Sequence, residues 1–170
     1  FVGVKLAARQ HFAADGGDGV LVAQHADFDL ARTNHAGFHE DAAIEGARIL
    51  YVEDSILVQK IARIALRDIG GFCVEFCTNG VEALVMAAHS MPDLLLLDRN
   101  LPDMSGMELL KRLRRDAALK NVPVIFITAT TDTQDLEELR KLSQMPVIRK
   151  PFNPKFLAGE IERCWQSAVV

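Results

Sequence analysis

Five side chains that could handle phosphate or a metal ion each end or follow a short apolar run. Glu53 and Asp54 follow ILYV, and Asp98 follows LLLL. Thr128 ends VIFIT, and Lys150 follows VIR. Three carboxylates held close together repel one another, and a hard divalent cation such as Mg²⁺ prefers carboxylate and phosphate oxygens as ligands. With a cation bound, one carboxylate could attack phosphorus as a nucleophile, and the metal and the lysine could stabilise the transferring phosphoryl group.

These side chains meet only if the apolar runs that carry them form one parallel sheet. The pattern predicts strands over residues 48–52, 72–76, 93–97, 122–127 and 147–149. Helical patterns separate the strands, so the strands must run parallel and their carboxyl ends must share one edge. Right-handed crossovers then give an α/β fold, a doubly wound five-stranded parallel sheet of the (βα)5 type. Ligands bind beyond the carboxyl ends of such strands.

The helices are predicted from capping residues and apolar spacing. Ser55, Ser105 and Asn153 are the expected caps of the first, third and last helices, and Gly70-Gly71 is expected to end the first. The residues expected to face the core in the first two helices are Ile56, Ile61, Ile64, Ala65, Ile69, Val81, Leu84, Val85 and Ala88. Leucines of the third and fourth helices are expected to do the same.

The chain divides into two parts of different composition. Residues 1–46 hold three basic and seven acidic residues, a net charge of −4, whereas residues 47–170 hold 16 of each sign. The first part lacks a sustained periodicity, and we interpret residues 1–46 as an extension that is partly disordered or loosely packed beside a folded domain of residues 47–170. Four histidines fall in this extension, and of these only His35 and His39 have helical i, i+4 spacing, without an accompanying Glu-x-x-His or Cys. No kinase-like motif surrounds any of the four, so we interpret the segment as a solvent-exposed tail without a function of its own.

Composition argues against several classes of partner. The net charge of −4 and pI near 5.7 do not favour nucleic-acid binding. No apolar run reaches the ~20 residues of a membrane helix, and no secretory signal is evident. Three cysteines form no metal-site spacing and are expected to be buried free thiols in a reducing compartment, which favours a cytoplasmic location.

The order and spacing of the motifs resemble the receiver domain of two-component response regulators, of the single-domain CheY-like kind. The motifs are YVEDS, LLLLDRNLPDMSG, VIFITA and VIRKPF. Their key residues are separated by 44 residues from Asp54 to Asp98, 30 more to Thr128 and 22 more to Lys150. The resemblance covers about residues 47–170 and implies a flavodoxin-like sheet with strand order 2-1-3-4-5.

The resemblance also implies a role for each site residue. Asp98 would be the phosphoacceptor, Lys150 would contact the phosphoryl group, and Thr128 would be the switch hydroxyl. The implied Mg²⁺ ligands are Glu53, Asp54, Asp98 and the backbone carbonyl of Asn100. Asn100 and Thr130 would flank the phosphate and tune its hydrolysis.

The implied function is a phosphorelay module that acts on no external substrate. A histidine kinase or phosphotransfer protein would donate the phosphoryl group, and an effector would bind the face formed by the fourth helix, the fifth strand and the fifth helix. The aromatic switch residue of many receivers is replaced by Val147. We expect no output domain after the last helix; the C-terminal receiver of a hybrid histidine kinase would look the same.

A phosphohydrolase of the haloacid-dehalogenase type is a less favoured alternative. That class also forms an aspartyl phosphate on an α/β sheet, but it needs a second Asp two residues after the nucleophile, and this position is Asn100. Members of that class also carry a cap domain as an insertion, and the intervals between the motifs of this sequence are too short to contain one. Asp103, beside Pro102, is interpreted as a turn residue and not as a metal ligand.

Overall fold

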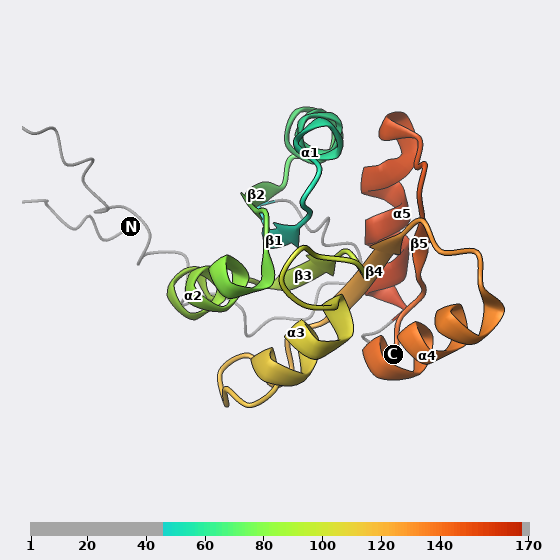
Figure 1. The fold of residues 1–170 in the computed structure, drawn as a ribbon. Helices are drawn as coiled ribbons and strands as arrows, with labels where there is room; N and C mark the ends of the chain where they lie inside the picture. Colours follow the sequence, from blue (N-terminus) through green and yellow to red (C-terminus); the bar gives the residue numbers. More distant parts are fainter. Residues whose placement is uncertain (1–45, 168–170) are drawn as a thin grey trace, which may run out of the picture. The chain divides into compact units, whose positions relative to one another are not determined.

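The computed structural model describes residues 46–167, which form a five-stranded sheet with helices on both faces (Figure 1). Neighbouring strands are parallel, in the order β2-β1-β3-β4-β5. The strands are β1 (Arg48–Val52), β2 (Cys73–Cys77), β3 (Leu94–Leu97), β4 (Val124–Thr128) and β5 (Ile148–Arg149). The predicted doubly wound sheet and its strand order are confirmed.

Helices follow each strand and cover the two faces of the sheet. They are α1 (Ile56–Arg63), which continues as the π-helical turn η1 (Ile64–Ile69), α2 (Gly80–Ser90), α3 (Gly106–Leu113), α4 (Thr133–Ser143) and α5 (Pro154–Gln166). Figure 1 shows α1 and α5 on one face and α2, α3 and α4 on the other. Two buried apolar clusters correspond to these two layers. This arrangement leaves the carboxyl edge of the sheet free of covering helices.

The central strands are buried on both faces, as their unbroken apolar sequences predict. All four leucines of β3 and the first four residues of β4 are fully inaccessible to solvent. Burial of each such side chain stabilises the fold by about 1.5–3 kcal/mol. Because β3 is held this firmly, the residue that follows it emerges at a fixed point of the sheet edge.

The predicted caps are confirmed. The Ser55, Ser105 and Asn153 side chains accept hydrogen bonds from backbone N–H groups in the first turns of α1, α3 and α5. Gly71, with φ of +68°, adopts the left-handed backbone that glycine permits, and it follows the end of η1. The starts of these three helices and the end of the first could therefore be predicted from local sequence signals.

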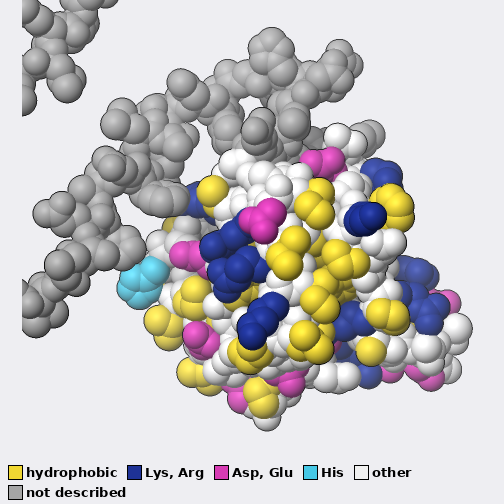
Figure 2. Space-filling model, turned by 90° about the horizontal axis from the view of Figure 1, so that it is seen from above, with side chains coloured by type: hydrophobic (Ala, Val, Ile, Leu, Met, Phe, Trp, Pro, Cys, Tyr) yellow, Lys and Arg dark blue, Asp and Glu magenta, His cyan; other side chains and the backbone are white. Residues whose placement is uncertain are grey.

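The predicted core face of the first helix is largely wrong. Ile56, Ile64 and Ile69 are each more than half exposed. The buried residues of α1 and η1 are Gln59, Ala62, Ala65 and Leu66, so of the predicted set only Ala65 is fully buried. Figure 2 looks from above onto the side of α1 and α5 and shows hydrophobic side chains at this surface with Lys and Arg beside them.

The same error affects the second helix. Val81 and Val85 are each 57% exposed and Ala88 is exposed, whereas Ala83 and Ala87 pack against the sheet. The inward leucines of α3 and α4 were predicted correctly, since all of them are buried except Leu142, which is half-buried against the same apolar cluster. In α3 and α4 the leucines therefore mark the buried face, whereas in α1 and α2 the large aliphatic side chains named above do not.

Two further findings concern the chain as a whole. No helix among residues 46–167 has the length and apolar character needed to cross a bilayer. The predicted extension of residues 1–46 lies outside the described residues, apart from Gly46, so that interpretation stays a prediction.

Candidate functional site

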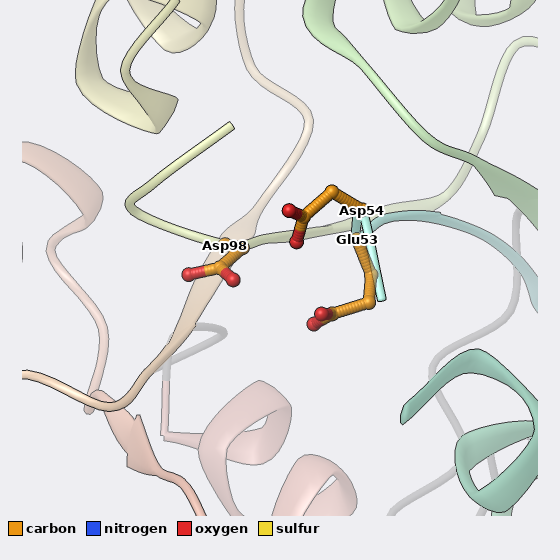
Figure 3. A group of neighbouring side chains, drawn as sticks. All are labelled: Glu53, Asp54 and Asp98. Carbon is orange, nitrogen blue, oxygen red and sulfur yellow. The ribbon is translucent and has the colours of Figure 1, made fainter. Parts of the chain in front are cut away.

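Three carboxylates gather at the carboxyl edge of the sheet, as the sequence predicts. Glu53 and Asp54 follow β1, Asp98 follows the adjacent strand β3, and one carboxylate oxygen of each lies within 4.8 Å of the others. Figure 3 shows the three carboxylate groups turned toward a common space. Glu53 and Asp98 are buried while Asp54 is exposed, so the cluster has a closed side and a side open to solvent.

Lys150 supplies the positive charge that faces this cluster. Its Nζ lies 2.6 Å from Oδ2 of Asp98 and also forms an ion pair with Glu53. Lys150 reaches the site from the end of β5, and its backbone N–H donates to the Thr128 carbonyl at 2.8 Å. One ammonium against three carboxylates leaves a formal charge of −2, which favours binding of a divalent cation.

The buried carboxylate of Glu53 is held by groups that the sequence prediction missed. The phenol of Tyr51 donates to Glu53 Oε2 at 3.1 Å, and the Ser55 N–H donates to Oε1 at 3.3 Å. Burial, together with the charge of Glu53, raises the pKa of Tyr51 well above its usual value, so the phenol stays protonated and remains a donor. Tyr51 and Glu53 are two positions apart, and residues two apart in a strand point to the same face of the sheet. The alternation of side chains along β1 could therefore have predicted this contact.

The predicted switch residue, Thr128, is fully buried at the end of β4. Its hydroxyl accepts a hydrogen bond from the Thr130 N–H at 3.2 Å. The Thr130 hydroxyl donates to Asp135 Oδ2 at 3.2 Å, and Asp135 Oδ1 pairs with Arg99 at 2.7 Å. Because Arg99 directly follows Asp98, this chain of contacts links both sides of the acid cluster to the first turn of α4.

Asn100 lies beside the acid cluster, with its backbone N–H 3.3 Å from Asp98 Oδ1. The loop that carries it is closed at its base, where the Gly106 N–H donates to the Arg99 carbonyl at 2.7 Å. A Cβ atom at position 106 would collide with the carbonyl oxygen of Asp98. Glycine is therefore required where α3 starts against the end of β3.

The position at which receivers often carry an aromatic residue is half-buried here. Val147 packs against the apolar cluster that also contains Leu139 of α4. Strand β5 begins one residue later and contains only Ile148–Arg149. The face of α4, β5 and α5 thus contains a small apolar side chain at this position.

The donor set fits a hard divalent cation. Its members are carboxylate oxygens that come from two adjacent strand ends, and the exposed side at Asp54 gives water and phosphate oxygens access. Glu53, Asp54 and Asp98 are the residues that could hold such an ion. A carboxylate that is close to both a cation and an ammonium can act as a nucleophile toward phosphorus.

Comparisons with known proteins agree with this geometry. Residues 49–162 match the family described as "Response regulator receiver domain". The polar-differentiation response regulator DivK of Brucella anthropi is 37% identical over 110 residues, which cover 64% of this chain and 89% of DivK.

Two solved structures share the fold. The chemotaxis response regulator CheY4 of Vibrio cholerae aligns with a TM-score of 0.64 and 31% identity, covering 70% of this chain and 98% of CheY4. The receiver domain of the sensor histidine kinase PA1611 of Pseudomonas aeruginosa aligns with a TM-score of 0.62 and 28% identity, covering 70% and 97% of the two chains, and its structure has a magnesium ion coordinated in the active-site cleft. The fold, the placement of the acids and the extent of the match lead to one assignment: the chain belongs to the response regulator receiver domains of two-component signalling.

Proposed function

We propose that Asp98 accepts a phosphoryl group, with Mg²⁺ as cofactor, from a histidine kinase or a phosphotransfer protein. The observation that carries the proposal is the position of the Asp98 carboxylate. It lies 2.6 Å from the ammonium of Lys150 and belongs to the cluster with Glu53 and Asp54. The close approach of a carboxylate, an ammonium group and further oxygen ligands supports the proposed role of Asp98 as nucleophile.

The transfer step forms one bond and breaks one. An oxygen lone pair of the Asp98 carboxylate forms a bond to phosphorus, and the bond from phosphorus to the donor imidazole nitrogen breaks. The imidazole retains that electron pair and takes up a proton if the solution pH favours it. Hydrolysis later transfers the phosphoryl group from Asp98 to water, so no external substrate is turned over and the module is not an enzyme in that sense.

The neighbouring residues each have a separate role in this proposal. The charged ammonium group of Lys150 turns toward the phosphoryl oxygens, and the Thr128 hydroxyl donates a hydrogen bond to one of them. The proposed Mg²⁺ ligands are Glu53, Asp54, Asp98 and the backbone carbonyl of Asn100. Bound Mg²⁺ would neutralise carboxylate charge and the charge on the phosphoryl oxygens.

We propose the surface of α4, β5 and α5 as the face that an effector protein reads. The support is the contact chain from Thr128 through Thr130 to Asp135, because Asp135 lies in the first turn of α4. If Thr128 donates to a phosphoryl oxygen, its hydroxyl reorients and the bond from the Thr130 N–H changes with it. Because Val147 stands in place of an aromatic residue, phosphorylation would alter this surface mainly through α4.

The receiver could act alone or as part of a hybrid histidine kinase. The alignment with the receiver domain of PA1611, itself named as a sensor histidine kinase, supports the second arrangement as an alternative. We also propose a cytoplasmic location, because the three cysteines Cys73, Cys77 and Cys164 are free thiols, in keeping with a reducing compartment. Only Cys77 is buried, so the expectation of three buried thiols is wrong.

The decisive experiment measures phosphorylation at Asp98. The full chain is incubated with Mg²⁺ and acetyl phosphate, and intact-mass spectrometry follows the addition of one phosphoryl group. We expect one phosphoryl adduct that hydroxylamine removes and that chelation of Mg²⁺ prevents. Asp98→Asn keeps the size of the side chain but removes the nucleophile, and it should carry no adduct.

A matched variant controls for general effects of losing a carboxylate. Asp116→Asn changes an exposed aspartate in the turn after α3 and should be phosphorylated like the wild type. An adduct that persists in Asp98→Asn, or a wild-type chain that gains none, would overturn the proposed function.

A further inference from the structure

The loop that follows the proposed phosphoacceptor, residues 99–105, is fixed at its base. The Gly106 N–H donates to the Arg99 carbonyl, and Asn100 and Ser105 form an antiparallel bridge. These contacts bring the two ends of the loop together but do not reach its tip, which contains Pro102 and Asp103. The position of the tip depends on what it contacts outside the loop.

Asp103 attaches the tip to the start of α2. Its Oδ1 accepts a hydrogen bond from the Gly80 N–H at 2.8 Å, and its Oδ2 accepts one from the Val81 N–H at 2.9 Å. Each carboxylate oxygen has its own donor, so both the position and the orientation of the side chain are fixed. Met104 packs beside this contact, where a Cβ atom on Gly80 would lie 2.6 Å from its Cγ.

Helix α2 has a cap of its own and does not depend on Asp103 for one. The Asn79 side chain accepts from the Glu82 N–H at 2.8 Å, and the Glu82 carboxylate accepts from the Thr78 N–H at 2.8 Å. Asn79 is therefore the N-cap of α2, and Glu82 reaches back to the residue that precedes this cap. The contact made by Asp103 therefore contributes mainly to holding the loop, and α2 serves as its support.

We propose that Asp103 is a positioning residue for the phosphoacceptor site, because it holds the loop after β3 so that the Asn100 backbone stays beside Asp98. The Asn100 N–H lies 3.3 Å from Asp98 Oδ1, between the closed base of the loop and its attached tip. The inference rests on the proposed function, in which the Asn100 carbonyl is a metal ligand. Asp103 itself contacts neither the metal nor the phosphoryl group.

The test compares two caps of the same helix in the full chain. Asp103→Ala removes the contact between loop and helix, and Asn79→Ala removes a cap of α2 that does not touch the loop. We expect Asp103→Ala to weaken Mg²⁺ binding about tenfold in calorimetric titration, in the lower part of the range for residues that orient metal ligands. Asn79→Ala should lower the melting temperature but leave Mg²⁺ affinity unchanged. Asp103→Asn retains one acceptor oxygen and should fall between wild type and Asp103→Ala.

A measurement without Mg²⁺ separates this inference from the proposed function. Amide hydrogen exchange of residues 99–105 should become faster in Asp103→Ala and not in Asn79→Ala. Equal exchange in both variants, or equal loss of Mg²⁺ affinity in both, would show that Asp103 is only a helix cap. A wild-type chain that binds no Mg²⁺ would instead overturn the proposed function, whatever the exchange data show.

Discussion

The two loops that border the acid cluster are held by different kinds of contact. The loop after β3, residues 99–105, is closed by a backbone hydrogen bond, and its tip is bonded to backbone N–H groups of α2. The loop after β4, residues 129–132, is linked to its surroundings by the hydroxyl of Thr130 and by Asp135, which pairs with Arg99. In the first loop both contacts end on backbone groups, the Arg99 carbonyl and the N–H groups of α2 that the Asp103 carboxylate binds, whereas in the second loop side chains bind one another.

This difference separates the fixed part of the site from the part that can respond. We expect the hydrogen bonds from Gly106 to Arg99 and from α2 to Asp103 to keep their partners when the charge at Asp98 changes, because they do not involve the Asp98 side chain. The ion pair of Arg99 and Asp135 is partly exposed, so water and salt weaken it. A phosphoryl group on Asp98 would add negative charge next to Arg99 and compete with Asp135 for it. The loop after β4 and α4 are thus the side on which phosphorylation should have its effect.

The strongest test of the fixed loop is Gly106→Ala. The new Cβ would collide with the Asp98 carbonyl oxygen and lie 3.1 Å from its carbonyl carbon. Since these are backbone atoms, relief requires moving the end of β3, and we expect the free energy of unfolding to fall by about 2–3 kcal/mol in urea titration. Gly159→Ala in α5 is the control; its nearest neighbour would be Arg163 Nη1 at 3.9 Å, and it should raise stability by about 0.5–1 kcal/mol. If Gly106→Ala is as stable as Gly159→Ala, the base of the loop is not tightly fixed.

The sheet and the acid cluster could be predicted because both depend on local signals. Each strand is an apolar run of the expected length, and parallel strands must place the following residues at one edge. Glu53, Asp54, Asp98 and Lys150 therefore come together as predicted. Their neighbours in the sequence were sufficient to place them.

The buried faces of α1 and α2 could not be predicted from hydrophobicity alone. In α1 the buried face includes Gln59, whose side-chain amide donates to the Glu53 carbonyl at 2.6 Å and the Cys77 carbonyl at 3.2 Å. In α2 it includes Ala83 and Ala87, which allow close packing on the sheet. The hydrogen bonds of Gln59 to distant carbonyl groups cannot be seen in the sequence. The alanines are too small to stand out in a hydrophobicity pattern.

The contact of Asp103 was missed for a related reason. The residue stands in a Pro-Asp turn, where the local interpretation is complete without a distant partner. Its two hydrogen bonds cross more than twenty positions of the chain to Gly80 and Val81. Only the packing of α2 beside α3 brings these groups together.

A second test addresses the packing between this loop and α2. Gly80→Ala would place its Cβ 2.6 Å from Cγ and Sδ of Met104. Because a flexible side chain can yield, we expect a smaller loss than for Gly106→Ala, about 1 kcal/mol in urea titration. The loss should shrink when Met104→Ala is added, since the double variant removes the clash. Additive losses would mean that Met104 does not fix the position of the tip.

The loop after β4 is tested by a double-mutant cycle on Arg99 and Asp135. We expect a coupling of about 0.5–1 kcal/mol in thermal or urea unfolding, which falls as salt is added. The pair of Glu108 and Arg112 on α3 is the matched control, and its more exposed side chains should give a weaker coupling. The same cycle with beryllofluoride, a phosphoryl mimic, should reduce the Arg99–Asp135 coupling only. A coupling that is insensitive to salt and to the mimic would contradict the contrast between the two loops.

The smallest expected effect is the pH dependence of the Asp103 contact. Partial desolvation raises the pKa of Asp103, but the hydrogen bonds from Gly80, Val81 and nearby N–H groups lower it by more, so the pKa lies below its usual range. The ionised form therefore stabilises the fold fully above the unfolded pKa of about 3.9, and this contribution is lost as pH falls through the lower folded value.

The measurement compares wild type with Asp103→Asn in urea titrations at decreasing pH. Wild type should be the more stable at pH 7. The difference should begin to narrow near pH 4, where Asp103 of the unfolded chain takes up a proton, and it should be lost only below the lower folded pKa, where the side chain is neutral in both states. Asn79→Ala removes a cap that does not titrate, so its difference from wild type should not follow the same trend. If the Asp103→Asn difference stays constant with pH, the carboxylate charge does not strengthen the bonds to α2, and the loop after β3 is held by packing and its closed base alone.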